Sequence, residues 1–269
     1  MENFKIGIAG MSSGAGSSFV TLLLADYISG RVSGKFKDGS TCNRIKESSG
    51  DFKDAPAVTV ASSGSLYFYD SLGMDRRFDK GSIIPFEEYS SYFSTQSSSQ
   101  EFKVPNVDNG ISWLVSSPKS IGAGISERER SRTLMRIQTQ YILWDMGHRV
   151  VEKDFEEASR DIDMLIYVID PLPSKMLPNY SCLEKVRESS LPVVYVINRM
   201  NPGVDKKDLL SFLKIKKPVY LPWVEPAVIY NSEYKCEYPY ENAEIRDKLL
   251  EPVERLASIV FTLQNSLWS

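Results

Sequence analysis

A short stretch near the N-terminus, Met11–Ser18, has the residue types needed to bind phosphate. It reads Met-Ser-Ser-Gly-Ala-Gly-Ser-Ser and follows the apolar run Lys5–Gly10. A run with helical spacing begins at Ser17. A glycine-rich turn between a strand and a helix directs backbone N–H groups and the positive end of the helix dipole at one point, which favours a polyphosphate. The sequence therefore predicts an anion cradle at this turn.

The turn differs from the usual phosphate-binding loop in one important residue. That loop is written G-x-x-x-x-G-K-[ST], with a lysine for the β- and γ-phosphates and a hydroxyl for Mg²⁺. With Gly16 as the last glycine, Ser17 takes the lysine position, Ser18 takes the hydroxyl position and Met11 falls on the first glycine. The sequence thus predicts a backbone anion-binding turn and the Mg²⁺-binding hydroxyl of Ser18, but no lysine ammonium group in the loop. A purely structural strand-to-helix turn of small residues remains the alternative.

Polar residues also end three later apolar runs. Asp145 lies near the end of 141–147, Asp170 follows 164–169, and Asn198 lies near the end of 192–199. Ligands of wound parallel sheets bind at the carboxyl ends of the strands, so these side chains are candidates for one site with the loop. Simpler interpretations remain, because Asp and Asn commonly cap turns.

The elements that would position these residues form an α/β pattern. Near-continuous apolar runs separated by helices predict a doubly wound, mainly parallel sheet with helices on both faces. We expect one domain over 1–269. Further strands are expected at 57–61, 111–116 and 218–223, and helices at 17–29 with Gly30 as C-cap, 154–161, 183–189 and 245–263.

Several other conspicuous residues have ordinary structural interpretations. We interpret His148 as a surface loop residue, and Trp144 and Trp223 as packing residues. The stretch 31–54 is expected to be irregular and 90–100 to be a serine-rich loop. A solvated helix face, with contact to phosphate or a partner as the alternative, is expected after Ser126 for Glu127, Arg128, Glu129, Arg130, Arg132 and Arg136.

Composition excludes several function classes. The 269 residues are 42% hydrophobic and 25% charged, as in ordinary globular proteins, and the net charge of −3 gives no overall attraction to nucleic acid or anionic lipid. The three cysteines lack C-x-x-C spacing, which argues against a disulfide framework or a zinc site and favours a reducing compartment. No apolar run approaches the roughly 20 residues of a membrane span. We therefore expect a cytoplasmic protein without membrane insertion.

On these motifs the chain resembles the ParA/MinD-type P-loop ATPases, whose loop is written K-G-G-x-G-K-[ST]. That loop aligns with Ser12–Ser18, so Ser12 replaces the signature lysine of the family and Ser17 replaces the phosphate lysine. A switch aspartate follows the second strand in the family, where this chain has Ala61-Ser62-Ser63-Gly64. The resemblance implies a P-loop NTPase-like fold with eroded catalytic groups.

The resemblance also implies roles for particular residues. Asp145 would orient magnesium-bound water as the catalytic carboxylate, Ser18 and Asp145 would hold Mg²⁺, and Asn198-Arg199 matches the adenine-reading pair. Contacts to ATP or ADP are implied for Met11, Ser12, Ser13, Gly14, Ala15, Gly16, Ser17, Ser18, Asn198, Arg199, Pro222 and Val224.

The function implied is that of a degenerate nucleotide-binding module with weak or no hydrolysis. It would form a homodimer and bind a protein partner in positioning or assembly. Two alternatives stay open. One is an active ATPase whose cation comes from residues 31–53 or from a second subunit, and the other is a nucleotide-free scaffold.

Overall fold

The computed structural model describes residues 3–36, 56–62, 64–78, 83–95, 106–120, 125–148, 151 and 155–267. Most of the lysine-containing stretch 31–54, including Lys37, Arg44, Lys46 and Lys53, lies outside these ranges, as does Ser63. Within the described part of the chain, no helix is both long enough and apolar enough to span a bilayer.

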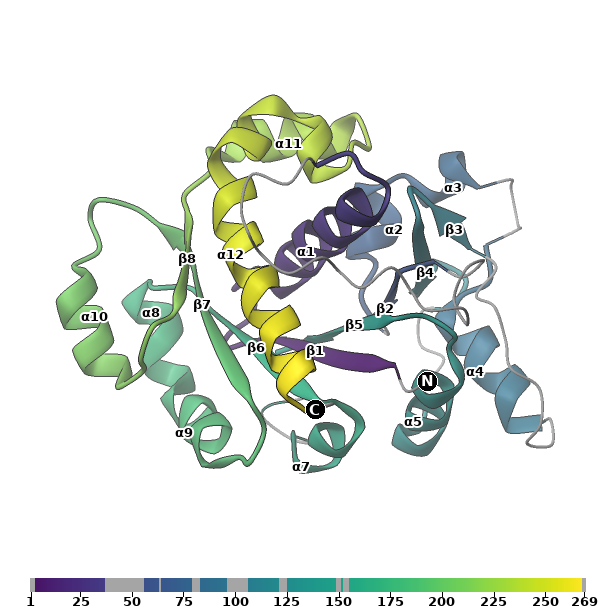
Figure 1. The fold of residues 1–269 in the computed structure, drawn as a ribbon, viewed down its shortest axis with the longest axis horizontal. Helices are drawn as coiled ribbons and strands as arrows, with labels where there is room; N and C mark the ends of the chain where they lie inside the picture. Colours follow the sequence, from purple (N-terminus) through teal and green to yellow (C-terminus); the bar gives the residue numbers. More distant parts are fainter. Residues whose placement is uncertain are drawn as a thin grey trace.

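The described strands form one eight-stranded sheet in the order β3-β4-β2-β5-β1-β6-β7-β8 (Figure 1). The short β3 pairs antiparallel with β4, and every other pair is parallel. This confirms the predicted fold class. The strand bounds are β1 Phe4–Gly10, β2 Val58–Ser62, β3 Val107–Asp108, β4 Ile111–Val115, β5 Tyr141–Gly147, β6 Met164–Ile169, β7 Val193–Met200 and β8 Val219–Pro222.

Helices cover both faces of this sheet (Figure 1). One face carries α1 Ser17–Val32, α2 Tyr67–Ser71, α3 Met74–Arg77, α11 Pro226–Tyr234, η3 Pro239–Glu241 and α12 Ala243–Leu267. The other carries α4 Phe86–Thr95, α5 Glu127–Arg136, α7 Phe155–Ala158, η1 Ser159–Asp161, α8 Pro173–Met176, η2 Leu177–Asn179, α9 Tyr180–Glu188 and α10 Lys206–Leu213.

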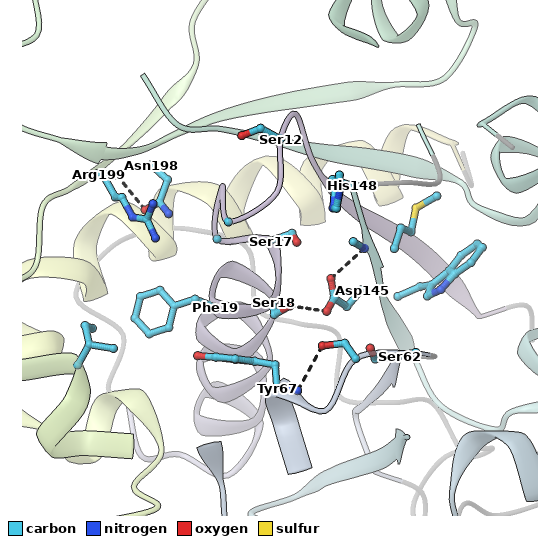
Figure 2. Close-up of a pocket in the computed structure, with 18 of the residues that line it drawn as sticks. Ser12, Ser17, Ser18, Phe19, Ser62, Tyr67, Asp145, His148, Asn198 and Arg199 are labelled. Atoms are coloured by element: carbon cyan, nitrogen blue, oxygen red, sulfur yellow. Dashed lines mark hydrogen bonds between the residues drawn. The ribbon is translucent and has the colours of Figure 1, made fainter. Parts of the chain in front are cut away.

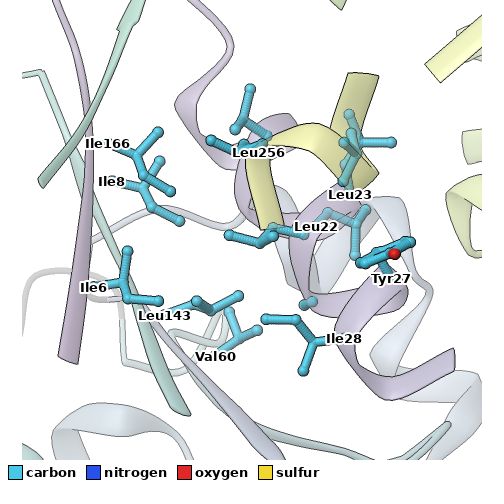
Figure 3. Close-up of a cluster of buried hydrophobic side chains, with 14 of the residues drawn as sticks. Ile6, Ile8, Leu22, Leu23, Tyr27, Ile28, Val60, Leu143, Ile166 and Leu256 are labelled. Atoms are coloured by element: carbon cyan, nitrogen blue, oxygen red, sulfur yellow. The ribbon is translucent and has the colours of Figure 1, made fainter. Parts of the chain in front are cut away.

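Alternation along the strands divides the core into two clusters. Ile6 and Ile8 of β1 and Leu143 of β5 point to the α1 face, where they pack against Leu23 and Leu256 (Figure 3). Their neighbours in the strands point the other way, as Ile142 and Trp144 do. A strand buried on both faces needs apolar residues at every position. This explains why the strands read as continuous apolar runs in the sequence.

Two boundary predictions were wrong. Gly30 does not end the first helix, since α1 continues to Val32 with Ser33 as its C-cap. The glycine is instead required by packing, because a Cβ at Gly30 would overlap the ring of Phe36. The serine-rich stretch begins inside a helix rather than a loop, because α4 extends to Thr95 and buries the Ser90 hydroxyl against Thr133 at 3.0 Å.

Candidate functional site

Two glycines determine the backbone conformation of the turn between β1 and α1. Gly14 has φ +74° and Gly16, the N-cap of α1, has φ +97°, both in the left-handed region that favours glycine. The first N–H groups of a helix have no acceptor inside the helix. The loop therefore presents the N-terminus of a 16-residue helix at the carboxyl edge of the sheet.

Two distant side chains fix this loop from outside. The Asn198 amide of β7 donates to the Ala15 carbonyl at 2.9 Å, and the Lys175 ammonium of α8 donates to the Ser13 carbonyl at 3.1 Å. A Cβ at Gly16 would collide with the Asn198 amide. Glycine is required at position 16 both by its φ and by this close approach.

Asp145 lies beside the loop and is held by hydroxyl groups (Figure 2). The Ser18 hydroxyl donates to one carboxylate oxygen at 2.6 Å, and the Gly147 N–H donates to the other at 3.3 Å. Burial raises the pKa of Asp145, while the hydrogen bonds from Ser18, Gly147 and Ser17 oppose that rise. The predicted pair of Ser18 and Asp145 is thus brought into direct contact.

The loop opens into a pocket of about 760 Å³, large enough for a nucleotide-sized ligand. Its polar end is formed by the loop, Asp145, Ser62 and His148. Apolar and aromatic side chains also line the pocket; they come from α1, α2, α11, α12 and the segment after β8, namely Phe19, Tyr67, Ile229, Leu249 and Val224. Figure 2 shows Phe19 and Tyr67 among them. The polar lining suits a charged group such as a phosphate, and the apolar lining suits a planar apolar group such as a ring.

Tyr67 and Glu233 close the wall between α2 and α11. Burial raises the pKa of Tyr67 well above its ordinary value, and the adjacent Glu233 carboxylate, which hydrogen-bonds the phenol, raises it further. The phenol therefore stays protonated and can donate a hydrogen bond.

The structure brings most of the predicted site residues to this pocket. Ser12, Gly14, Gly16, Ser17, Ser18, Asp145, Asn198, Arg199, Pro222 and Val224 line it. Met11, Ser13 and Ala15 do not. Met11 is buried in the core against the α5 face, Ala15 is also buried, and Ser13 is exposed at the loop tip. For these three, only backbone groups remain available to a ligand in the pocket.

Arg199 has a partner at the strand ends. Its guanidinium donates to the Asp170 carboxylate at 2.7 Å, and Asp170 also accepts the Leu172 N–H at 3.1 Å. The Asn198 side-chain oxygen accepts the N–H of Arg199, whose φ is +57°. The two residues of the predicted adenine-reading pair therefore hold the strand ends together as well as lining the pocket.

Sequence reasoning missed two basic residues of the pocket. His148, interpreted as a surface residue, lines the pocket next to Met146 and Gly147. Arg130, interpreted as part of a solvated helix face, also lines it, with its guanidinium carbon 5.3 Å from the ring centre of Trp144. No pattern in the charged run of α5 distinguishes Arg130 from its neighbours.

Ser62 was noted in the sequence only as the replacement for a switch aspartate. Its Cα pairs with that of Asp145 across β2 and β5, so both side chains lie on one side of the sheet edge. The Gly64 N–H that follows is held by the Ser116 hydroxyl at 2.8 Å, which in turn donates to the buried Glu87 at 2.6 Å. Its position at the end of a strand was the one sequence signal that could have identified Ser62 as a site residue.

Comparison with solved structures identifies the architecture. A ParA family ATPase from Chlorobium tepidum matches with a TM-score of 0.68 at 14% identity, over 95% of this chain and 99% of that chain. The chain has the fold of the ParA and MinD ATPases. No protein-family model and no curated protein sequence matches it.

Two further structures share the ParA/MinD fold with this chain. A chain of the MinC:MinD cell division protein complex of Aquifex aeolicus matches with a TM-score of 0.61 at 16% identity, over 94% of this chain and 96% of that chain. The septum site-determining protein MinD of Pyrococcus horikoshii, complexed with Mg-ADP, matches with a TM-score of 0.57 at 12% identity, over 97% of this chain and 99% of that chain. The fold expected from the sequence resemblance is confirmed.

The residues of this ParA/MinD fold fit a nucleotide and Mg²⁺. The hydroxyl oxygens of Ser12 and Ser62 are buried and have no hydrogen-bond partner in the described structure, and both residues line the pocket. Ser18 and Asp145 supply hard oxygen atoms. Mg²⁺ is usually held by one or two carboxylates with phosphate and water, so the lack of any group of three His, Cys, Asp or Glu residues among the described positions does not conflict with it.

Proposed function

We propose that this protein is a degenerate ParA/MinD-like module that binds ATP or ADP with Mg²⁺ and hydrolyses ATP weakly or not at all. The observation that carries the proposal is the loop with left-handed Gly14 and Gly16, which opens at the N-terminus of α1 into a nucleotide-sized pocket beside the bonded pair of Ser18 and Asp145. Backbone N–H groups and the helix dipole bind phosphate without an ammonium group.

The base would occupy the apolar end of the pocket. Phe19, Ile229 and Val224 give the pocket an apolar lining, and Asn198 and Arg199 line the same pocket. Figure 2 shows Phe19 on the same side of the view as Asn198 and Arg199. Mg²⁺ would be held by Ser18 and Asp145, where it would neutralise phosphate charge. In the resemblance, Asp145 also orients a water molecule bound by the metal, and its position next to Ser18 supports that role.

Hydrolysis is expected to be slow because two catalytic groups are replaced. Ser17 stands at the lysine position of the loop, and Ser62 stands at the end of β2 where the family has a carboxylate nearby. Phosphoryl transfer depends mainly on positioned charge, and loss of one positioned donor typically costs about 10²–10³ in rate.

Dimer formation and partner binding complete the proposal. The loop tip at Ser13 is exposed, and Lys175, which contacts it, lies between Leu172 and Leu177, which are 53% and 60% exposed. This apolar rim next to the loop is a suitable surface for a second copy. A protein partner is proposed by analogy with the MinD structure solved together with MinC.

Calorimetry with ATP and ADP, each with Mg²⁺ or with EDTA, tests nucleotide binding. We expect binding of both nucleotides with a Kd below about 1 mM. Ser18→Ala should weaken binding about tenfold in Mg²⁺ and change little in EDTA, because in this proposal the Ser18 hydroxyl acts on the nucleotide through the metal. Ser266→Ala, 17 residues beyond the pocket-lining Leu249 on α12, is the matched control. No heat with either nucleotide at millimolar concentration contradicts the proposal.

A phosphate-release assay separates this module from an active ATPase. We expect the wild type and Asp145→Ala to release phosphate at the same low rate. Clear turnover in the wild type that Asp145→Ala abolishes would show that the missing charge is replaced well enough for catalysis.

A further inference from the structure

The pocket contains a second carboxylate, which phosphate and metal binding do not use. Among the described residues that line the pocket, the carboxylates are Asp145, beside the loop, and Glu233, on α11. Asp145 is bonded to Ser18 and belongs to the proposed Mg²⁺ site. Glu233 would repel a phosphate, so it suits a part of the ligand that donates hydrogen bonds. In a nucleotide, such donors are the ribose hydroxyls and the N–H groups of the base.

Glu233 lies on the face of α11 that is turned toward the pocket. Ile229 and Glu233 are four residues apart, so they share one side of the helix, and both line the pocket. Tyr230 and Tyr234, each one position further along, are 62% and 86% exposed. The orientation of α11 therefore directs this carboxylate inward and the two tyrosines toward solvent.

The end of α11 that carries Glu233 is fixed by contacts to other elements. The Glu233 carbonyl accepts the Cys236 N–H at 2.9 Å, and the Cys236 carbonyl accepts the Arg77 guanidinium of α3. Two residues later, the Tyr238 hydroxyl donates to Asp108 of β3 at 2.6 Å. Glu233 is therefore carried by a segment that is tied to the sheet, which lowers the entropy cost of a ligand contact.

A phenol on the neighbouring helix α2 orients the Glu233 carboxylate. Tyr67, the first residue of α2, also lines the pocket, and its hydroxyl is hydrogen-bonded to Glu233. An ionised carboxylate has about four acceptor positions, so one bond from the phenol leaves positions for a ligand. In Figure 2 the Tyr67 side chain extends from the side of Ser62 and Asp145 toward the side of Phe19.

The surroundings of Tyr67 indicate which part of a nucleotide would meet Glu233. The charge of Asp145 acts on the same phenol that is bonded to Glu233, so Glu233 faces a ligand close to its phosphates but not at them. The apolar lining from Phe19, Ile229 and Val224 suits the base. The sugar joins the base to the phosphates, and its hydroxyl groups are donors that a carboxylate can accept.

We propose that Glu233 binds the ribose hydroxyls of the nucleotide, so that the pocket selects ribonucleotides over 2′-deoxyribonucleotides. This inference rests on the proposed nucleotide site. Acidic side chains accept hydrogen bonds from the ribose 2′-hydroxyl in Rossmann folds, because the hydroxyl donates and the carboxylate only accepts. Tyr67 is a positioning residue, since its hydroxyl holds the carboxylate in the orientation that faces the ligand.

Titrations of the full chain with Mg-ATP and Mg-2′-deoxy-ATP test the inference, and the ratio of the two Kd values is the quantity compared. This ratio cancels the general effect of removing a negative charge from a pocket that binds phosphate. We expect the wild type to bind ATP about 10- to 100-fold more tightly, the usual range for a hydrogen bond to a charged group. Glu233→Ala should reduce this preference to less than about threefold.

Two further variants separate a direct contact from a general effect of charge or structure. Tyr67→Phe keeps the ring and removes the hydroxyl that orients the carboxylate, so its preference should lie between those of the wild type and Glu233→Ala. Glu251→Ala is the matched control. Glu251 is exposed on α12, two residues beyond the pocket-lining Leu249, and does not itself line the pocket. Its removal should leave the wild-type ratio.

The outcomes distinguish this inference from the function it rests on. If the wild type binds ATP and 2′-deoxy-ATP equally, or if Glu233→Ala leaves the preference unchanged, Glu233 does not bind the sugar and only the proposed function survives. If Glu251→Ala lowers the preference as much as Glu233→Ala does, the preference follows from general charge and the inference is wrong. If neither nucleotide binds to the wild type at millimolar concentration, both the inference and the proposed function are wrong.

Discussion

Asp26 of α1, the helix that presents the phosphate loop, should make the protein less stable as pH rises from about 4 to about 7. Burial raises the pKa of its carboxyl from 3.8 to about 6. The N–H of Tyr240, the charge of Lys35 and the amide of Asn109 act in the opposite direction, and the charge of Glu241 adds to the rise. The Tyr240 N–H and the Asn109 amide reach the carboxylate at 3.0 and 3.1 Å.

The sign and size of the effect follow from proton linkage. Between the unfolded pKa of 3.8 and the folded pKa near 6, the folded state binds more protons than the unfolded state, so the free energy of unfolding falls as pH rises. A pKa difference of about two units corresponds to roughly 3 kcal/mol. The stability contributed by the neutral carboxyl is complete below pH 3.8 and lost above pH 6.

Urea denaturation of the wild type and of Asp26→Asn across this pH range measures the effect. Asparagine does not titrate, so it serves as the reference. It offers one oxygen acceptor to the Tyr240 N–H and the Asn109 amide, whereas the carboxyl group of Asp26 offers two. The stability of the wild type relative to the variant should fall by roughly 3 kcal/mol from pH 4 to pH 7.5. A difference that stays constant would refute the reasoning. An increase with pH would mean that Lys35 and the donor groups outweigh burial.

Three further predictions concern the loop and the core. Lys175→Met should speed amide exchange at the loop about two- to fivefold, because the Ser13 carbonyl loses a charged donor, whereas Lys175→Arg should not. Leu143→Ala, in the fully buried centre of β5, should cost about 2–5 kcal/mol of unfolding free energy in urea, and a loss below 1 kcal/mol would show that the site is loosely packed. Tyr141→Phe removes the 2.6 Å hydrogen bond to Gln264 and should lower the free energy of unfolding by about 1 kcal/mol. We expect faster amide exchange near the end of α12, and unchanged exchange there would contradict the prediction.

The sequence by itself determined the order of the seven parallel strands and the edge of the sheet at which the site lies. Apolar runs such as 141–147 and 164–169 encode strands locally, because a strand covered on both faces needs an apolar side chain at each position. The residues at their ends, Asp145 and Asn198, gather with the loop because parallel strands all end at one edge. For that reason the position of Asp145 beside the loop could be predicted from the residues, whereas its pairing with Ser18 was implied by the family resemblance.

Only the tertiary structure decided how the loop is held and which cation lies near it. The Asn198 amide and the Ala15 carbonyl are 183 residues apart, and the Lys175 ammonium and the Ser13 carbonyl are 162 apart. Arg130 lines the pocket and Arg132 does not, because contacts of Thr133 with Ser90 of α4 and of Ser131 with Asp161 of η1 fix the rotation of α5. Helical periodicity defines a face of α5, but the neighbours that α5 packs against determine where that face points.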